Sequence, residues 1–155
     1  DFGVICFVDL PDKVPHFTKG MTKAFVVAPG TNNAVAPTPT VTMTIADYSF
    51  DTDTALTAGR QMVKVVNNGP QLHELTVIKL DSAKTLHDLE KYIQAYKGDI
   101  PATTMGGIAG VRSGTTNYFE LNLTPGNYIL ICFVPDSKDG KPHCAHGMLQ
   151  PFTVN

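Results

Sequence analysis

The chain has 155 residues and a formal charge of −2, with 12 Lys or Arg against 14 Asp or Glu. This length allows one well-packed core with an appendage, and the charge balance without a basic run argues against a nucleic-acid partner. No apolar run approaches the roughly 20 residues that span a bilayer, so no membrane span is expected. Because the sequence starts at Asp1 without a signal peptide, we expect a processed chain of the periplasm or the extracellular space, or a fragment of something longer.

The first 28 residues repeat the pattern found at the end of the chain. Ile5-Cys6-Phe7-Val8 matches Ile131-Cys132-Phe133-Val134, and the run from Pro15 to Met21 matches the run from Pro142 to Met148. Both copies place four residues between the histidine and the methionine. A repeat this specific predicts that residues 1–28 are the closing β-hairpin of a preceding, truncated repeat. Residues 29–40 are rich in proline and predict a linker, so the complete domain should span 41–155.

Alternating apolar and polar residues predict most of that domain to be β-structure. Strands are expected at residues 41–47, 60–66, 73–80 and 116–123 and in a hairpin from Gly126 to Val154. Residues 51–59 and the glycine-rich residues 103–114 are interpreted as a turn region and a surface loop. Roughly seven strands with tight turns are typical of an all-β, Greek-key sandwich.

One segment, residues 85–97, has a helical pattern. Thr85 followed by Asp88 is a helix-capping pair, and four apolar residues at helical spacing form one stripe, namely Leu86, Leu89, Ile93 and Tyr96. We therefore expect a single short helix that packs against the sheet.

The final hairpin brings three metal-binding side chains together in sequence. Cys132 ends its first strand, and His143 and Met148 leave the loop before its second strand. Thiolate and thioether groups hold Cu(I) well, while imidazole suits both Cu(I) and Cu(II). The hairpin thus predicts a copper site that needs a second histidine. Taken alone, each of these residue types is more often structural than a metal ligand. Cys132 and Met148 could pack in a core, and a histidine in a turn could be exposed to solvent.

These residues resemble those of the cupredoxins, the small blue copper proteins. The turn from Asn67 to His73 resembles the turn before the first copper histidine of that family, and the run from Gly126 to Cys132 resembles the strand that leads to the copper cysteine. The resemblance implies a cupredoxin-like sandwich with one type 1 copper ion, held by His73, Cys132, His143 and Met148. Ten residues separate Cys132 from His143, a loop longer than in most of the family and similar to that of copper nitrite reductases.

Other candidate ligands remain beside this set. His146 competes with His143, but the N-terminal repeat has Lys19 at the position of His146, which favours His143. Cys144 is interpreted as a free thiol or an intermolecular disulfide. Cys6, His16 and Met21 repeat the ligand spacing without a first histidine, so they are expected to form a site only if another domain or chain completes it.

The resulting hypothesis is an electron-transfer domain of an exported protein, with a redox protein as its partner. No histidine flanks Cys132 to relay electrons to a second copper, so an enzyme is not expected. The alternative is a structural module of an extracellular assembly, in which metal is absent or only stabilising and residues 1–28 associate with another copy.

Overall fold

The computed structural model describes residues 1–6, 8, 12–30, 34–95 and 97–155. Within them the chain forms two compact units, Asp1–Ala36 and Pro37–Asn155, which we call unit 1 and unit 2. The interpretations that involve Phe7, part of the linker (residues 31–33) and Tyr96 fall outside the described residues. None of the described helices is long and apolar enough to cross a membrane.

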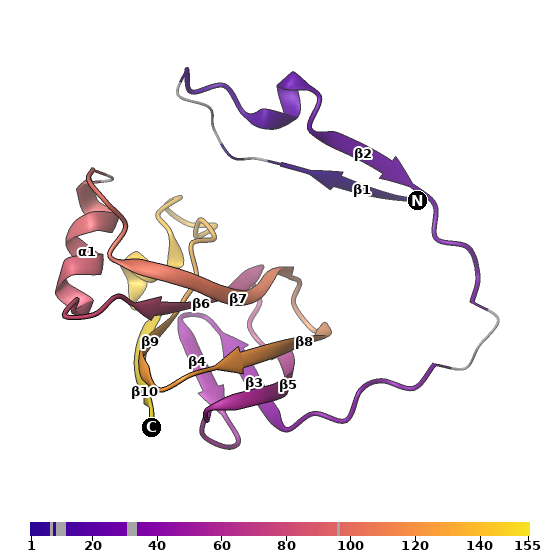
Figure 1. The fold of residues 1–155 in the computed structure, drawn as a ribbon. Helices are drawn as coiled ribbons and strands as arrows, with labels where there is room; N and C mark the ends of the chain where they lie inside the picture. The colour runs from indigo at the N-terminus through magenta and orange to yellow at the C-terminus, as the bar shows by residue number, and fades with distance from the viewer. Residues whose placement is uncertain (7, 9–11, 31–33, 96) are drawn as a thin grey trace. The chain divides into compact units, whose positions relative to one another are not determined.

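Unit 1 is a two-stranded antiparallel hairpin with a short 3-10 helix between its strands. Strand β1 spans Phe2–Ile5, the helix η1 spans His16–Lys19, and strand β2 spans Thr22–Phe25 (Figure 1). Phe2 lies opposite Phe25 at the open end of the ladder. Its strand residues are all exposed, so this hairpin buries no core of its own.

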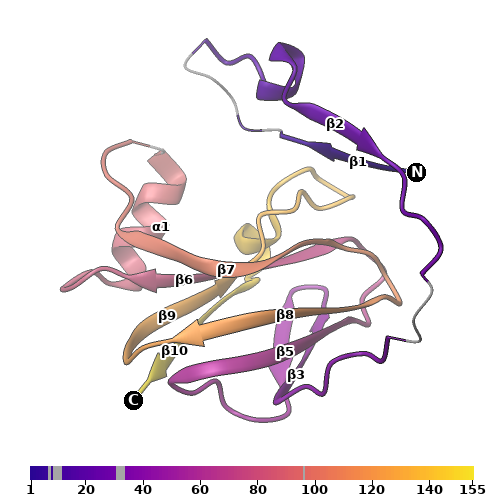
Figure 2. The same ribbon diagram turned by 45° about the vertical axis from the view of Figure 1, so that its right-hand side comes forward.

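Unit 2 is a sandwich of two four-stranded sheets with strand orders β4-β3-β5-β8 and β10-β9-β6-β7 (Figures 1 and 2). The strands are β3 (Val41–Ala46), β4 (Ser49–Thr52), β5 (Gly59–Asn67), β6 (His73–Leu80), β7 (Ala102–Val111), β8 (Thr116–Leu123), β9 (Gly126–Ile131) and β10 (Leu149–Val154). Strands β3 and β5 pair in parallel, whereas the other neighbours in unit 2 are antiparallel. The predicted all-β sandwich is confirmed.

The core of unit 2 lies between the two sheets. Alternate residues of β3 and β5 point inward, and Ile45, Val63 and Val65 are fully buried there. Leu75 and Val77 of β6 face them from the other sheet and join the same cluster. Burial of these side chains, each contributing roughly 1.5–3 kcal/mol of transfer free energy, makes a stiff scaffold for the loops at the end of the sandwich.

Helix α1, Leu86–Ala95, covers the outer face of the second sheet beside β6 and β7 (Figures 1 and 2). The predicted cap is present: the Thr85 amide donates to Asp88 Oδ2 at 2.8 Å, and the Asp88 amide donates to Thr85 Oγ1 at 3.3 Å. Leu89 is buried against Ile78 and Ile131. The described residues of the apolar stripe, Leu86, Leu89 and Ile93, therefore pack on the sheet, as expected.

Two sequence interpretations were wrong. Residues 51–52 of the predicted turn region belong to β4, and residues 103–111 of the predicted surface loop 103–114 belong to β7. At Gly107 (φ +147°) an added Cβ would lie 2.0 Å from the carbonyl oxygen of Leu75. The glycine thus allows β7 to pass close to β6 opposite Thr76, between two register shifts of this ladder. Glycine is more common in loops than inside strands, so the sequence pattern did not indicate a strand here.

Candidate metal centre

The turn that presents His73 is fixed by one buried amide. The Asn67 side chain donates from Nδ2 to the carbonyl oxygens of Gln71 and Val111, both at 2.8 Å, and accepts the Gly69 amide at 2.8 Å through Oδ1. This amide is fully buried and makes three of its four hydrogen bonds within the turn and to β7. The Asn-Asn-Gly-Pro sequence therefore ends β5 and starts β6 with His73 at a defined position.

The loop between β9 and β10 presents the other three predicted ligands. The His143 amide donates to Val134 at 2.9 Å, and the Cys132 amide donates to Met148 at 3.2 Å, which ties the loop across its base. The 3-10 helix η2, His143–His146, ends at Gly147, whose φ of +99° suits glycine. Cys132, His143 and Met148 are all completely buried.

These two segments converge at one end of the sandwich. One donor atom each of His73, Cys132 and His143 lies within 4.8 Å of the other two. Cys132 Sγ is 3.4 Å from His143 Nδ1, and the two imidazole centroids are 4.6 Å apart. Sulfur and nitrogen ligands at about 2.3 and 2.0 Å from one tetrahedral ion would be separated by roughly 3.5 Å, so this spacing suits a shared metal.

The Nδ1 atom of His73 has no hydrogen-bond partner among the described residues. The other ring nitrogen, Nε2, lies 2.8 Å from Asp47 Oδ1. Because a carboxylate can only accept, Nε2 carries the hydrogen and Nδ1 keeps its lone pair, yet Nδ1 is buried without a hydrogen bond. A buried acceptor without a partner is costly unless a ligand fills it, so the residues present fit a metal ion.

The Cys132 sulfur lies in an environment that a bound cation would change. Burial raises the pKa of this thiol, and amide donors oppose the effect, including the Glu74 amide at 3.4 Å. Burial also lowers the pKa of His143, which keeps that imidazole neutral and its lone pair available. A metal deprotonates a coordinated thiol outright, and the amide would then stabilise the thiolate.

A carboxylate network behind the histidines was missed by sequence reasoning. Gln71 Nε2 lies 3.0 Å from Asp47 Oδ2 and 2.9 Å from Asp136 Oδ2, and Asp136 approaches His143 Nε2 at 3.7 Å. Partial burial raises the pKa of Asp47, but hydrogen bonds from Gln71 and His73 outweigh it and keep the pKa below its usual value. One glutamine thus joins the carboxylates that face both imidazoles. No local sequence pattern marks such residues.

Tyr48 covers the outer side of His143. Its ring meets the His143 ring edge-on at a centroid distance of 5.5 Å, and its hydroxyl donates to Asp136. Hydrogen bonding to Asp136 raises the pKa of Tyr48. Because Tyr48 itself is only half-buried, it lies between the fully buried imidazole and solvent.

The competing residues lie elsewhere in unit 2. His146 Nε2 pairs with Asp139 Oδ1 at 3.1 Å in a partly exposed cluster with Asp136, and its ring is stacked at a tilt on Tyr48. Cys144 is a half-buried free cysteine that packs beside Leu149 and Phe133 on the α1 side of the sheet. Neither residue belongs to the His73–Cys132–His143 cluster.

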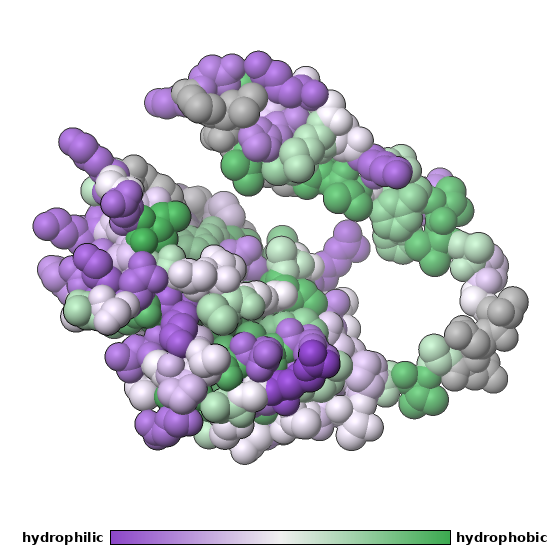
Figure 3. All heavy atoms as spheres, in the orientation of Figure 1, coloured by the Kyte–Doolittle hydropathy of each residue, from purple (hydrophilic) through white to green (hydrophobic). Residues whose placement is uncertain are grey.

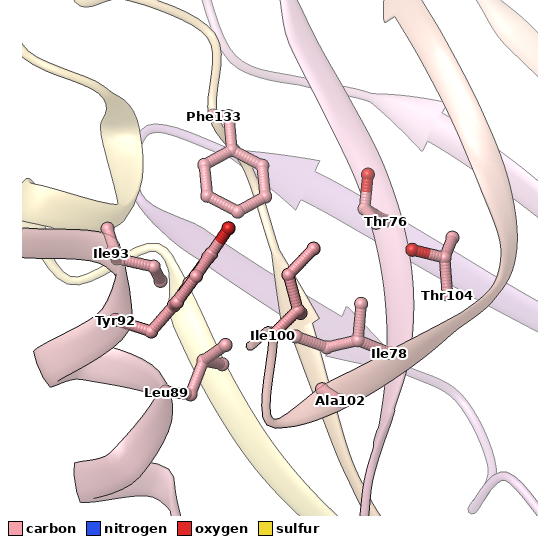
Figure 4. Close-up of a pocket in the computed structure, with 9 residues that line it drawn as sticks. All are labelled: Thr76, Ile78, Leu89, Tyr92, Ile93, Ile100, Ala102, Thr104 and Phe133. Atoms are coloured by element: carbon pink, nitrogen blue, oxygen red, sulfur yellow. The ribbon is translucent and has the colours of Figure 1, made fainter. Parts of the chain in front are cut away.

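A mainly apolar pocket of about 300 Å³ lies between α1 and the outer face of the sheet. Figure 4 shows Leu89, Tyr92 and Ile93 of α1 facing the strand residues, with Phe133 at one end. The Phe133 amide donates to Glu74 Oε1 at 2.8 Å, so the residue after Cys132 is tied to the residue after His73. The pocket therefore adjoins the backbone of the metal centre but contains none of its donors.

The comparisons with known proteins bear on the fold. No family model matches the chain, and no curated protein matches it. Among solved structures, the dithionite-reduced auracyanin from the photosynthetic bacterium Roseiflexus castenholzii is similar, with 20% identity and a TM-score of 0.50, over 74% of this chain and 94% of that one. Auracyanin is a cupredoxin, so the sheet order of unit 2 and this likeness together identify its fold as a cupredoxin-like β-sandwich.

Proposed function

We propose that unit 2 holds one copper ion in a type 1 centre and serves as an electron carrier. The observation that carries the proposal is the meeting of two buried imidazoles and a buried thiol from separate loops, with His73 Nδ1 lacking a hydrogen-bond partner in the described part of the chain. Two histidines and a cysteine with a weak axial methionine form a recognised electron-transfer site. His73, Cys132 and His143 would be the strong ligands and Met148 the axial one.

The copper would supply a Cu(I)/Cu(II) redox couple, and the residues around it would hold its ligands in fixed positions. Asp47 orients His73, the Glu74 amide donates to the Cys132 sulfur, and the buried turn of Asn67 holds both β5 and β6 in place. Ligands held by such partners need to move little when the charge of the centre changes. The similar auracyanin was studied in a dithionite-reduced form, which is in keeping with a redox role.

The test is a titration of the purified chain with Cu(II). We expect an intense visible absorption band from charge transfer between the Cys132 thiolate and the metal. Cys132→Ser should remove the band, while Cys144→Ser, a matched change of a thiol outside the cluster, should retain it. A colourless product from the folded wild-type chain, with no bound copper, would end this proposal.

We further propose that this carrier acts outside the cytoplasm with another redox protein as partner, and that it is not an enzyme. Tyr48 and His146 lie on the solvent side of His143 and would form part of the surface that meets the partner. Reduction of the copper-loaded chain by candidate partners, followed at the visible band, tests this.

A structural role for the chain is the second candidate, favoured by the apolar surface of unit 1. Its exposed apolar side chains include Phe2, Val4, Ile5, Met21 and Phe25, which are 43% to 61% exposed. Green, hydrophobic spheres on the surface of this unit are visible in Figure 3. Association through residues 1–28 predicts concentration-dependent dimers in sedimentation, which Phe2→Ser should weaken and Leu72→Ser in unit 2 should not. A monomer at all concentrations excludes it.

A further inference from the structure

The hairpin of unit 1 reproduces the ligand loop of unit 2 in its backbone hydrogen bonds. The Cys6 amide donates to Met21 at 3.2 Å, the same distance as between the Cys132 amide and Met148. The His16 amide donates to Val8 at 2.9 Å, matching the bond between His143 and Val134. The two loops therefore place their cysteine, histidine and methionine backbones alike, although one loop is a residue shorter.

The caps and the aromatic pairs of the two hairpins agree as well. Helix η1 ends at Gly20 with φ +93°, as η2 ends at Gly147 with φ +99°. Four residues before each cysteine, Phe2 stacks on Phe25 with centroids 5.8 Å apart, and Tyr128 stacks on Phe152 with centroids 5.3 Å apart. The repeat seen in the sequence is thus a repeat of conformation in the described residues of the hairpin.

Two of the three candidate donor atoms of unit 1 also meet. Cys6 Sγ lies 3.5 Å from His16 Nδ1, against 3.4 Å between Cys132 Sγ and His143 Nδ1. This contact forms inside the hairpin, without the strand that presents His73 in unit 2. From sequence, these residues were expected to need another domain or chain, but the thiol and the imidazole are already placed together.

Two differences decide which ion this pair would take. Residues 1–36 contain a single histidine, His16, so no second imidazole is available within the unit. Met21 is 57% exposed and Cys6 only half-buried, whereas Cys132 and Met148 are completely buried. A thiolate, a thioether and one imidazole form a soft donor set that selects Cu(I) over Cu(II), at a site open to exchange with solution.

We propose that unit 1 binds a second copper ion, as Cu(I), through Cys6, His16 and Met21. The Cys6 thiol loses one proton to solvent as the sulfur–copper bond forms, and copper stays in the Cu(I) state, so no oxidant or reductant takes part. The site differs from that of unit 2 in chemistry and accessibility. It accepts and releases Cu(I), and it gives no intense visible band.

The experiment is a titration of the full chain with Cu(I) held by a chromophoric Cu(I) chelator. We expect wild type to withdraw two Cu(I) per chain and Cys6→Ser to withdraw one. His16→Gln and Met21→Leu should each weaken the second Cu(I) by more than about tenfold, since loss of even an outer partner of a metal costs 10–100-fold. Cys144→Ser is the matched thiol control and should still withdraw two.

Alkylation of the thiols gives an independent readout. Cu(I) should protect Cys6 from iodoacetamide in wild type but not in His16→Gln, as followed by mass spectrometry of the peptide that contains Cys6. Uptake of Cu(I) by wild type that Cys6→Ser does not lower by one ion per chain would overturn the proposal. Cys6→Ser should leave the Cu(II) band of unit 2 unchanged, whereas Cys132→Ser removes it, so the two proposals can fail separately.

Discussion

Asp47 Oδ1 lies 2.8 Å from Nε2 of the completely buried His73 imidazole. The carboxylate comes from the turn after β3, while the histidine begins β6, so the contact joins the two sheets of unit 2. It fixes which ring nitrogen carries the hydrogen and leaves Nδ1 facing the other donors. Most of the expected behaviour of the centre depends on this pair.

Removing the charge of Asp47 should weaken copper binding. In Asp47→Asn the buried imidazole loses its carboxylate acceptor, and loss of such an outer partner typically lowers metal affinity by about 10–100-fold. Asp139→Asn is the matched control, because Asp139 pairs with His146 in the same way outside the cluster. Competition with a copper chelator measures both variants, and equal affinities for Asp47→Asn and wild type would show that the pair does not support the ligand.

A methyl group at Gly69 should disturb the same pair. An added Cβ would lie 2.9 Å from Asp47 Oδ1 and 3.0 Å from His73 Nε2, closer than such atoms normally approach. Gly69→Ala should therefore shift the visible band of the copper-loaded protein and weaken its binding. Gly3→Ala, where a Cβ meets nothing within 4 Å, is the control and should match wild type. An unshifted band in Gly69→Ala would show that the turn accommodates the added methyl group without disturbing the metal centre.

Asn67 should stabilise unit 2 even without metal. Asn67→Ala removes three hydrogen bonds of the buried amide, each contributing about 1 kcal/mol net, so we expect a loss of about 3 kcal/mol in the free energy of unfolding. Asn68→Ala changes an exposed neighbour and should stay within about 0.5 kcal/mol of wild type. Urea unfolding of the copper-free proteins tests this, and equal midpoints for the two variants would contradict it.

The cap of α1 should make stability depend on pH. Hydrogen bonds from Thr85 lower the pKa of Asp88 below its value in the unfolded chain. A carboxylate with a depressed pKa contributes stability that is present above about pH 4 and is lost as the pH falls through the folded pKa. The difference in Tm between wild type and Asp88→Asn should thus shrink below about pH 4. A difference in Tm that stays constant as the pH falls through this range would contradict the prediction.

Several secondary-structure elements of unit 2 could be predicted from short sequence patterns. Alternation predicted β6 and β8 at their observed bounds, and the Thr85–Asp88 pair predicted the start of α1. β7 could not be found this way, because its glycines have a high loop frequency. The approach of β6 explains Gly107, because its missing Cβ leaves room for the Leu75 carbonyl.

The sequence by itself determined the spacing of Cys132, His143 and Met148, its repetition in unit 1, and the turn before His73. These are properties of short segments, where turn chemistry and strand period act over a few residues. The tertiary structure decided that His73 meets Cys132 and that Asp47, Gln71 and Asp136 stand behind the imidazoles. Those contacts join loops from both sheets, and which loops meet depends on strand order and packing rather than on any local periodicity.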